Sequence, residues 1–136
     1  MNDFCETADQ ALQAMKQRAL ELNMKGVAMV AASEGDRIQS WTSKMLVVGS
    51  LKKNASADDP EMNVLAVAYS KAAEMADTLQ VSGSGVRPPL KGEFGWPGGV
   101  VARGKTGFLF AAFSGGAGVD DVKVSQTGLA VLTAKL

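Results

Sequence analysis

The chain has 136 residues, of which 46% are hydrophobic and 21% charged, and its 14 basic residues balance its 14 acidic ones. This length predicts one domain, residues 1–136, with a core of its own. Zero net charge argues against a nucleic-acid partner, and no apolar run is long enough to span a bilayer, so we expect no membrane partner either. The acidic first segment, unlike a secretory signal, favours a cytoplasmic location.

The first elements along the chain are predicted to be a helix and a hairpin. A helix is expected near residues 7–24. Two apolar or alternating runs at 27–32 and 37–42 flank a turn-prone segment at 34–36, which predicts two antiparallel strands. Residues 44–49 either continue the second strand or bend away. The helix is predicted from apolar residues that recur at three- and four-residue steps, namely Ala8, Ala11, Leu12, Met15, Ala19 and Leu22.

A second helix is predicted over residues 60–79. Asp59 is a suitable capping residue, Pro60 suits the first helical position, and Glu61 places an acid in the first turn. Its buried stripe is expected to consist of Leu65, Ala68, Tyr69, Ala72, Met75, Ala76 and Leu79.

A long segment rich in glycine and proline, residues 81–99, follows this helix. It holds three of the four prolines of the chain, together with Phe94 and Trp96. Structureless loops of this length are uncommon in compact domains and are usually functional or disordered. Because disordered linkers seldom carry aromatic residues, we expect this loop to be ordered and functional.

A second hairpin and a final helix complete the predicted fold. Strands are expected near 98–103 and 107–113, and the second strand is so apolar that it should be central and covered on both faces. The last helix is expected over 119–134. Two hairpins separated by helices predict an α+β domain, an antiparallel sheet of about five strands flanked by helices.

The sequence contains no histidine. This excludes histidine-based nucleophile triads, and with Cys5 as the single cysteine it argues against a zinc site. Acid–base chemistry would then fall on lysine, tyrosine, a carboxylate or the thiol. No spacing of a nucleophile and a base is visible, so an enzyme that uses Lys71 or Glu93 is the weakest of the functional hypotheses.

The chain combines glycine-rich turns, an apolar hairpin and paired acids, at Pro97-Gly98-Gly99, Ser114-Gly115-Gly116, Asp120-Asp121 and Gly128. This combination resembles the GlcG/HbpS-like family, which includes the C-terminal domain of PduO-type proteins. The segment SKAAEMADT is similar to the second helix of that family and places Lys71 at its lysine. The resemblance spans nearly the whole chain.

The resemblance implies a profilin-like α+β fold and frequent homo-oligomers. Some family members are related to haem, and others accompany glycolate or corrinoid metabolism. Haem is thus the cofactor that the resemblance implies, and Lys71 is the matching site residue. The sequence departs from haem binders in lacking a histidine for the axial position, so any haem binding is predicted to be weak and not through histidine.

The segment SGGAGVDD lies between the last strand and the last helix. It is similar to a phosphate site at a helix N-terminus, but paired acids would stand where the phosphate belongs. We expect the glycines to turn the chain and the acids to cap the helix. Ser114 and the backbone amides of Gly115 and Gly116 remain candidates for the mouth of a pocket.

Several further residues are candidate ligand contacts. Lys71 lies near the edge of the buried stripe, as a boundary lysine or as a cation directed into a cleft. Arg87 precedes two prolines that stiffen the loop, which suits a clamp for a carboxylate or phosphate. Phe94 and Trp96 either form the wall of an apolar pocket or pin the loop to the body or to a neighbouring subunit. Glu93 lies between these groups.

The favoured hypothesis is a non-enzymatic, oligomeric accessory protein that binds a haem-like, corrinoid-like or organic-acid ligand. The alternative is an assembly module without a ligand, in which the 81–99 loop is a subunit contact. In either case we expect residues 81–99 to pack across a subunit boundary, with Arg87 and Trp96 facing a cleft. The expected ligand contacts are Lys71, Arg87, Glu93, Phe94, Trp96, Ser114 and Gly115.

Overall fold

The two predicted hairpins join into one four-stranded antiparallel sheet in the computed structural model, which describes residues 2–54 and 60–136. The strand order is β2–β1–β6–β5. The first hairpin pairs β1 with β2, the second pairs β5 with β6, and β1 and β6 lie side by side in the centre. The strands are β1 (Gly26–Ser33), β2 (Trp41–Val48), β5 (Gly99–Arg103) and β6 (Phe108–Ser114).

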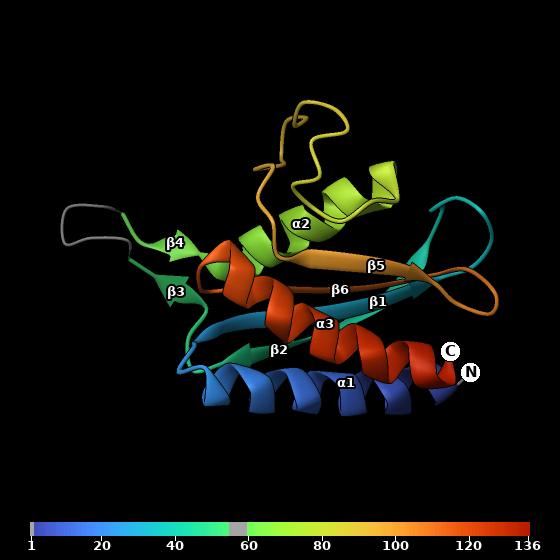
Figure 1. Cartoon of the computed structure of the whole chain (residues 1–136), viewed down its shortest axis with the longest axis horizontal. Coiled ribbons are helices and arrows are strands. Elements are labelled where there is room, and N and C mark those ends of the chain that lie inside the picture. Colours follow the sequence, from blue (N-terminus) through green and yellow to red (C-terminus); the bar gives the residue numbers. More distant parts are fainter. Residues whose placement is uncertain (1, 55–59) are drawn as a thin grey trace.

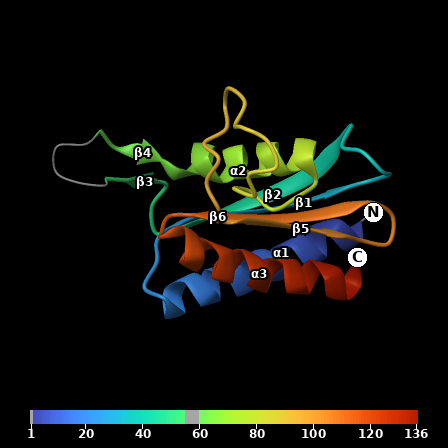
Figure 2. The same cartoon turned by 45° about the horizontal axis from the view of Figure 1, so that its top comes forward.

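Helices cover both faces of this sheet. Helices α1 (Asn2–Glu21) and α3 (Gly118–Lys135) lie side by side on one face, and α2 (Val64–Thr78) lies on the other (Figures 1 and 2). The predicted α+β class is confirmed. In the described part of the chain, no helix has both the length and the apolar character that crossing a membrane requires.

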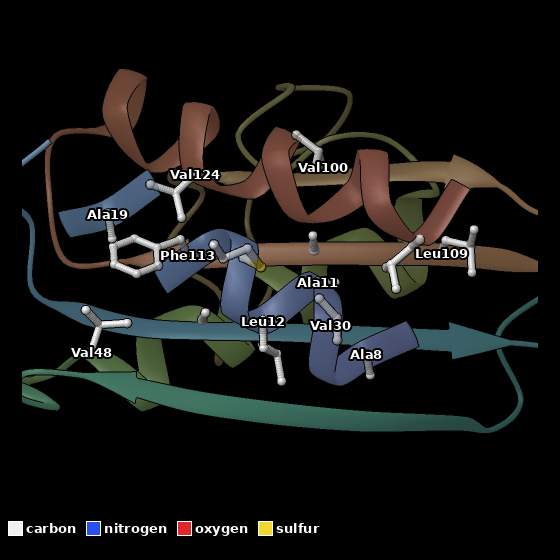
Figure 3. Close-up of a cluster of buried hydrophobic side chains, with 14 of the residues drawn as sticks. Ala8, Ala11, Leu12, Ala19, Val30, Val48, Val100, Leu109, Phe113 and Val124 are labelled. Atoms are coloured by element: carbon white, nitrogen blue, oxygen red, sulfur yellow. The ribbon is translucent and has the colours of Figure 1, made fainter. Parts of the chain in front are cut away.

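The apolar strand β6 divides its side chains between the two layers. Leu109 and Phe113 pack toward α1 and α3, and Phe110 packs toward α2. Figure 3 shows Phe113 beside Ala19 of α1 and Val124 of α3. Burial of one such phenylalanine contributes about 2–3 kcal/mol. The prediction of a central strand covered on both faces is therefore confirmed.

Two predicted boundaries near the N-terminus were wrong. Helix α1 already begins at Asn2, and Thr7, the residue at which the helix was predicted to begin, is buried within it. The second strand occupies 41–48, and residues 37–40 belong to the preceding loop. This loop is drawn toward the tip of the other hairpin, because the Gly35 amide donates to the Thr106 carbonyl oxygen at 2.8 Å.

The start of α2 also differs from the prediction. Asn63 caps the helix, and its Oδ1 accepts hydrogen bonds from the amides of Leu65 (3.0 Å) and Ala66 (3.2 Å). Pro60 lies before the helix, and the predicted cap, Asp59, lies outside the described residues. Asn63 holds this position because β4 (Met62–Asn63) pairs with β3 (Lys52–Lys53) in a small separate ribbon.

The long loop after α2 folds back over that helix (Figure 1). At its base, the Gly99 amide donates to Ser82 Oγ (2.8 Å), and the Gly83 amide donates to Glu74 Oε2 of α2 (2.9 Å). Gly83 has a φ of 73°, and a Cβ there would lie 2.7 Å from Pro97 N, so glycine is required. The loop covers a side of α2 that the predicted stripe left exposed, and Glu74 is buried there. Lys71 is buried where α2 meets the end of β6 and the start of α3.

Candidate functional site

A pocket of about 270 Å³ lies at one end of the sheet, where β6 ends and α3 begins. The β3–β4 ribbon, the start of α2 and the base of the long loop complete its walls. These segments are distant in the sequence, and Figure 1 shows how β6, α3, β4 and α2 converge at this end of the molecule. The pocket has a charged floor, a glycine-rich side and an apolar wall.

The floor is a buried ion pair between Lys71 of α2 and Asp121 of α3. Lys71 Nζ donates to Asp121 Oδ2 at 2.9 Å and to the carbonyl oxygen of Phe113 at 2.8 Å. The two charged side chains are only 3% and 4% exposed. Lys71 thereby connects α2 and α3, which lie on opposite faces of the sheet, through the end of β6.

Burial shifts both partners of this pair toward their neutral forms. Desolvation lowers the pKa of Lys71, although attraction to Asp121 opposes the shift. Desolvation likewise raises the pKa of Asp121, against the opposing effects of Lys71 and of the Gly116 amide. The floor of the pocket therefore holds an amine and a carboxyl between which a proton moves more readily than in water.

The glycine-rich side is the turn between β6 and α3. Ser114 and Gly115 line the pocket, Lys53 Nζ donates to the carbonyl oxygen of Gly115, and the Gly116 amide donates to Asp121 Oδ1 at 2.9 Å. Helix α3 has no side-chain cap. The prediction that the paired acids cap this helix was therefore wrong. The carboxylate of the buried Asp121 instead accepts hydrogen bonds from Lys71 and from the Gly116 amide.

The apolar wall comes from two segments. Met62 of β4 and Val64, the first residue of α2, come from one segment, and Trp96 and Pro97 come from the base of the long loop. The Trp96 ring stacks on that of Phe94, with 4.5 Å between centroids and an angle of 23° between planes. Phe94 thus packs against the indole ring of Trp96 and does not itself line the pocket.

Arg87 and Glu93 lie outside the pocket wall and bind each other. Arg87 donates to both oxygens of Glu93 (2.8 and 2.9 Å), twice to Asp77 Oδ2 of α2 (3.0 and 2.8 Å), and to the Pro88 carbonyl oxygen (3.0 Å). These bonds use all five N–H donors of the guanidinium. Arg87 therefore connects the long loop to α2 through hydrogen bonds, and none of its N–H donors is left for an external anion.

The hydrogen bonds between Arg87 and Glu93 shift the pKa values of both side chains so that their charged forms are favoured. Glu93 and Asp77 raise the pKa of Arg87 above its usual range. Arg87 lowers the pKa of Glu93, and the Leu90 amide, which donates to Glu93 Oε1 at 3.0 Å, lowers it further. A glutamate whose pKa is lowered does not suit the role of a general acid near neutral pH.

The structure thus brings together four of the seven residues expected to contact a ligand: Lys71, Trp96, Ser114 and Gly115. Sequence reasoning missed Lys53 and the role of Asp121 as the partner of Lys71. A signal for Asp121 was present, because it lies at helical spacing from the buried Val124, Gly128 and Leu132. An acid on an apolar stripe predicts a buried partner. Lys53 had no such signal.

Comparisons with known proteins add no relative to this description. No protein-family model matches the sequence, and no curated protein is similar enough to it to count as a relative. Within residues 2–54 and 60–136, no group of three or more cysteine, aspartate or glutamate side chains is placed to hold a metal ion.

Proposed function

We propose that this chain is a non-enzymatic, cytoplasmic accessory protein that binds a small organic acid in the pocket between β6, α2 and α3. The observation that supports the proposal best is the combination of excess positive charge with an apolar wall in one pocket. The resemblance to the GlcG/HbpS-like family agrees with such a role, since some of its members accompany glycolate metabolism.

The charges around the pocket favour a monoanion. Two lysines and one aspartate line it, which leaves one net positive charge. Asp121 neutralises Lys71, so the excess belongs to Lys53, whose described hydrogen bond goes to a neutral carbonyl oxygen. A carboxylate that enters the pocket would approach Lys53, and the apolar part of the acid would pack against Trp96 and Met62.

The size of the pocket favours a compact ligand. Its volume of about 270 Å³ lies below the range of about 300–1,000 Å³ that is usual for sites of drug-sized molecules. A whole haem or corrinoid macrocycle would not be enclosed. Titration with hemin is accordingly expected to give no sharp Soret shift, and tight stoichiometric binding with a six-coordinate spectrum would contradict this expectation.

Calorimetric titration tests the proposal with benzoate and butyrate, each compared with its neutral amide. The acids are expected to bind about ten-fold or more tightly than the amides, since a tenfold difference corresponds to only about 1.4 kcal/mol. Lys53→Gln should remove most of this preference. Lys52→Gln is the matched control, because Lys52 precedes Lys53 in the same strand and does not line the pocket. Equal binding of acid and amide, or equal effects of the two variants, would contradict the proposal.

A second candidate function is self-association through the long loop. Five large apolar side chains of this loop are exposed, namely Val81, Val86, Leu90, Phe94 and Trp96. Apolar surface concentrated on one segment marks an interaction site. The zero net charge of the chain offers little repulsion between copies. In this function the loop is a subunit contact, and Trp96 both lines the pocket and touches the neighbour.

Sedimentation velocity at dilute concentration tests this second candidate. If Trp96 anchors the contact, Trp96→Ala should cost about 2 kcal/mol or more of association free energy. Leu20→Ala is the control, since Leu20 is also an exposed large apolar residue but lies on α1 and not on the loop. A wild-type protein that is already monomeric, or an oligomer that Trp96→Ala leaves intact, would rule this function out.

A further inference from the structure

The amine of Lys71 is placed unusually for a lysine that serves only as a buried cation. An ammonium group carries three N–H donors, and the described contacts use two of them, on Asp121 and on the Phe113 carbonyl oxygen. The structure describes no protein acceptor for the third. Lys71 lines the pocket, while 97% of its surface is withdrawn from solvent. The amine is thus shielded from bulk water and open to a molecule in the pocket.

We propose that Lys71 condenses with the carbonyl group of a small 2-oxo acid to form an imine in this pocket. The inference rests on the proposed function, because it assigns the carboxylate of the same ligand to Lys53 and its carbonyl carbon to Lys71. The two amines approach the pocket from different segments, β3 and α2, so that one short ligand can meet both.

The reaction needs no partner beyond the ligand. Lys71 passes one proton to Asp121, and the neutral Nζ attacks the carbonyl carbon to form the C–N bond of a carbinolamine. A second N–H proton moves to the carbinolamine oxygen, which becomes a hydroxyl group. The C–O bond then breaks as the nitrogen lone pair forms the C=N bond, and Asp121 returns its proton to the departing hydroxyl, which leaves as water. Overall, the ammonium loses two hydrogens to that water and keeps the third on the iminium nitrogen. No electrons are gained or lost.

The surroundings of Lys71 suit each step. Desolvated lysines are the ones that form imines in proteins, because burial favours the neutral, nucleophilic amine. The carboxylate that accepts the proton is already 2.9 Å away and is held in place by the Gly116 amide. Asp121 can hold the proton until the C–O bond breaks, since burial raises its pKa above that of an exposed aspartate. The positive iminium that results remains next to this carboxyl group.

The experiment is reductive trapping with pyruvate as the probe. The full chain is incubated with pyruvate and cyanoborohydride, and the site of the adduct is mapped by peptide mass spectrometry. Lys71 should be modified about ten-fold more than any other lysine, as expected of an activated amine. Saturating butyrate should suppress the adduct at Lys71 alone. No adduct at Lys71, or an even distribution over surface lysines, would overturn the inference.

Variants separate this inference from the proposed function. Lys71→Arg keeps a cation opposite Asp121 and should abolish the adduct, because a guanidinium does not condense with the carbonyl group. Lys53→Gln should leave the site of the adduct unchanged and raise the pyruvate concentration that is needed. If Lys71→Arg does not fold, the wild-type map with butyrate competition decides alone. Binding of butyrate without a pyruvate adduct would overturn only the imine, whereas absence of both would overturn the proposed function as well.

Discussion

Two ion pairs with similar N–O distances differ in their burial and in the direction of their pKa shifts. Lys71 and Asp121 meet at 2.9 Å on the floor of the pocket, and Arg87 and Glu93 meet at 2.8 Å in the long loop. The first pair is withdrawn from solvent on both sides, whereas the arginine of the second is 23% exposed and also binds the largely exposed Asp77.

The pKa shifts of the two pairs run in opposite directions. At the pocket floor, desolvation outweighs attraction and moves both groups toward neutrality. In the loop, hydrogen bonds dominate and move both groups toward their charged forms. Burial at the pocket floor, in contrast to partial exposure and a second carboxylate, Asp77, in the loop, decides whether a pair can exchange a proton or only holds two segments together.

The largest effect is expected from breaking the buried pair. Asp121→Ala leaves Lys71 buried without a countercharge, which should cost about 3–5 kcal/mol of unfolding free energy. Urea denaturation measures this loss. The double variant Lys71→Met/Asp121→Leu replaces both charges by apolar groups and should be clearly more stable than Asp121→Ala. A single variant that unfolds like the wild type would show that solvent reaches the pair.

A smaller effect is expected from crowding the same pair. Gly98 has a φ of 134°, and a Cβ there would overlap Lys71 Nζ and lie 3.0 Å from Asp121 Cβ. Gly98→Ala should therefore cost about 2–3 kcal/mol, from backbone strain together with displacement of the lysine. Gly92→Ala is the matched control, since its φ is 94° but no atom lies within 4 Å of the added Cβ. Equal losses in thermal denaturation would mean that the strain alone matters.

The smallest effect on stability is expected at the Arg87–Glu93 pair of the long loop, and it should depend on pH. Because the pKa of Glu93 is lowered from 4.5 in the folded chain, its pairing with Arg87 stabilises the fold above that pH. The contribution is lost as the pH falls through the folded pKa. Arg87→Gln should therefore lower the urea midpoint slightly at pH 7, and this difference should shrink steadily as the pH is lowered below 4.5. Arg37→Gln, at an exposed arginine of the β1–β2 loop, should show no such trend. A difference that does not shrink as the pH falls would assign the role of Arg87 to packing.

The secondary structure and the fold class were largely predictable because their causes are local. The three- and four-residue spacing in α1 and the apolar run of β6 are signals carried by neighbouring residues. The boundaries that were wrong depended on distant partners. The cap of α2 moved to Asn63 through the pairing of β4 with β3, and residues 34–40 became a loop held by the other hairpin.

The candidate site divides in the same way. The sequence alone placed Trp96 in the long loop, and Ser114 and Gly115 at the junction of the last strand with the last helix. It placed Lys71 only near the edge of the buried stripe of its helix, and Asp121 at the start of the last helix as a capping acid. Only the tertiary structure decided that these two charges, 50 positions apart, meet each other, and that Arg87 faces Glu93 and Asp77 and not a ligand. The physical reason is that a charge specifies only the need for a partner, whereas the packing of α2 and α3 at the end of β6 selects which partner lies within reach.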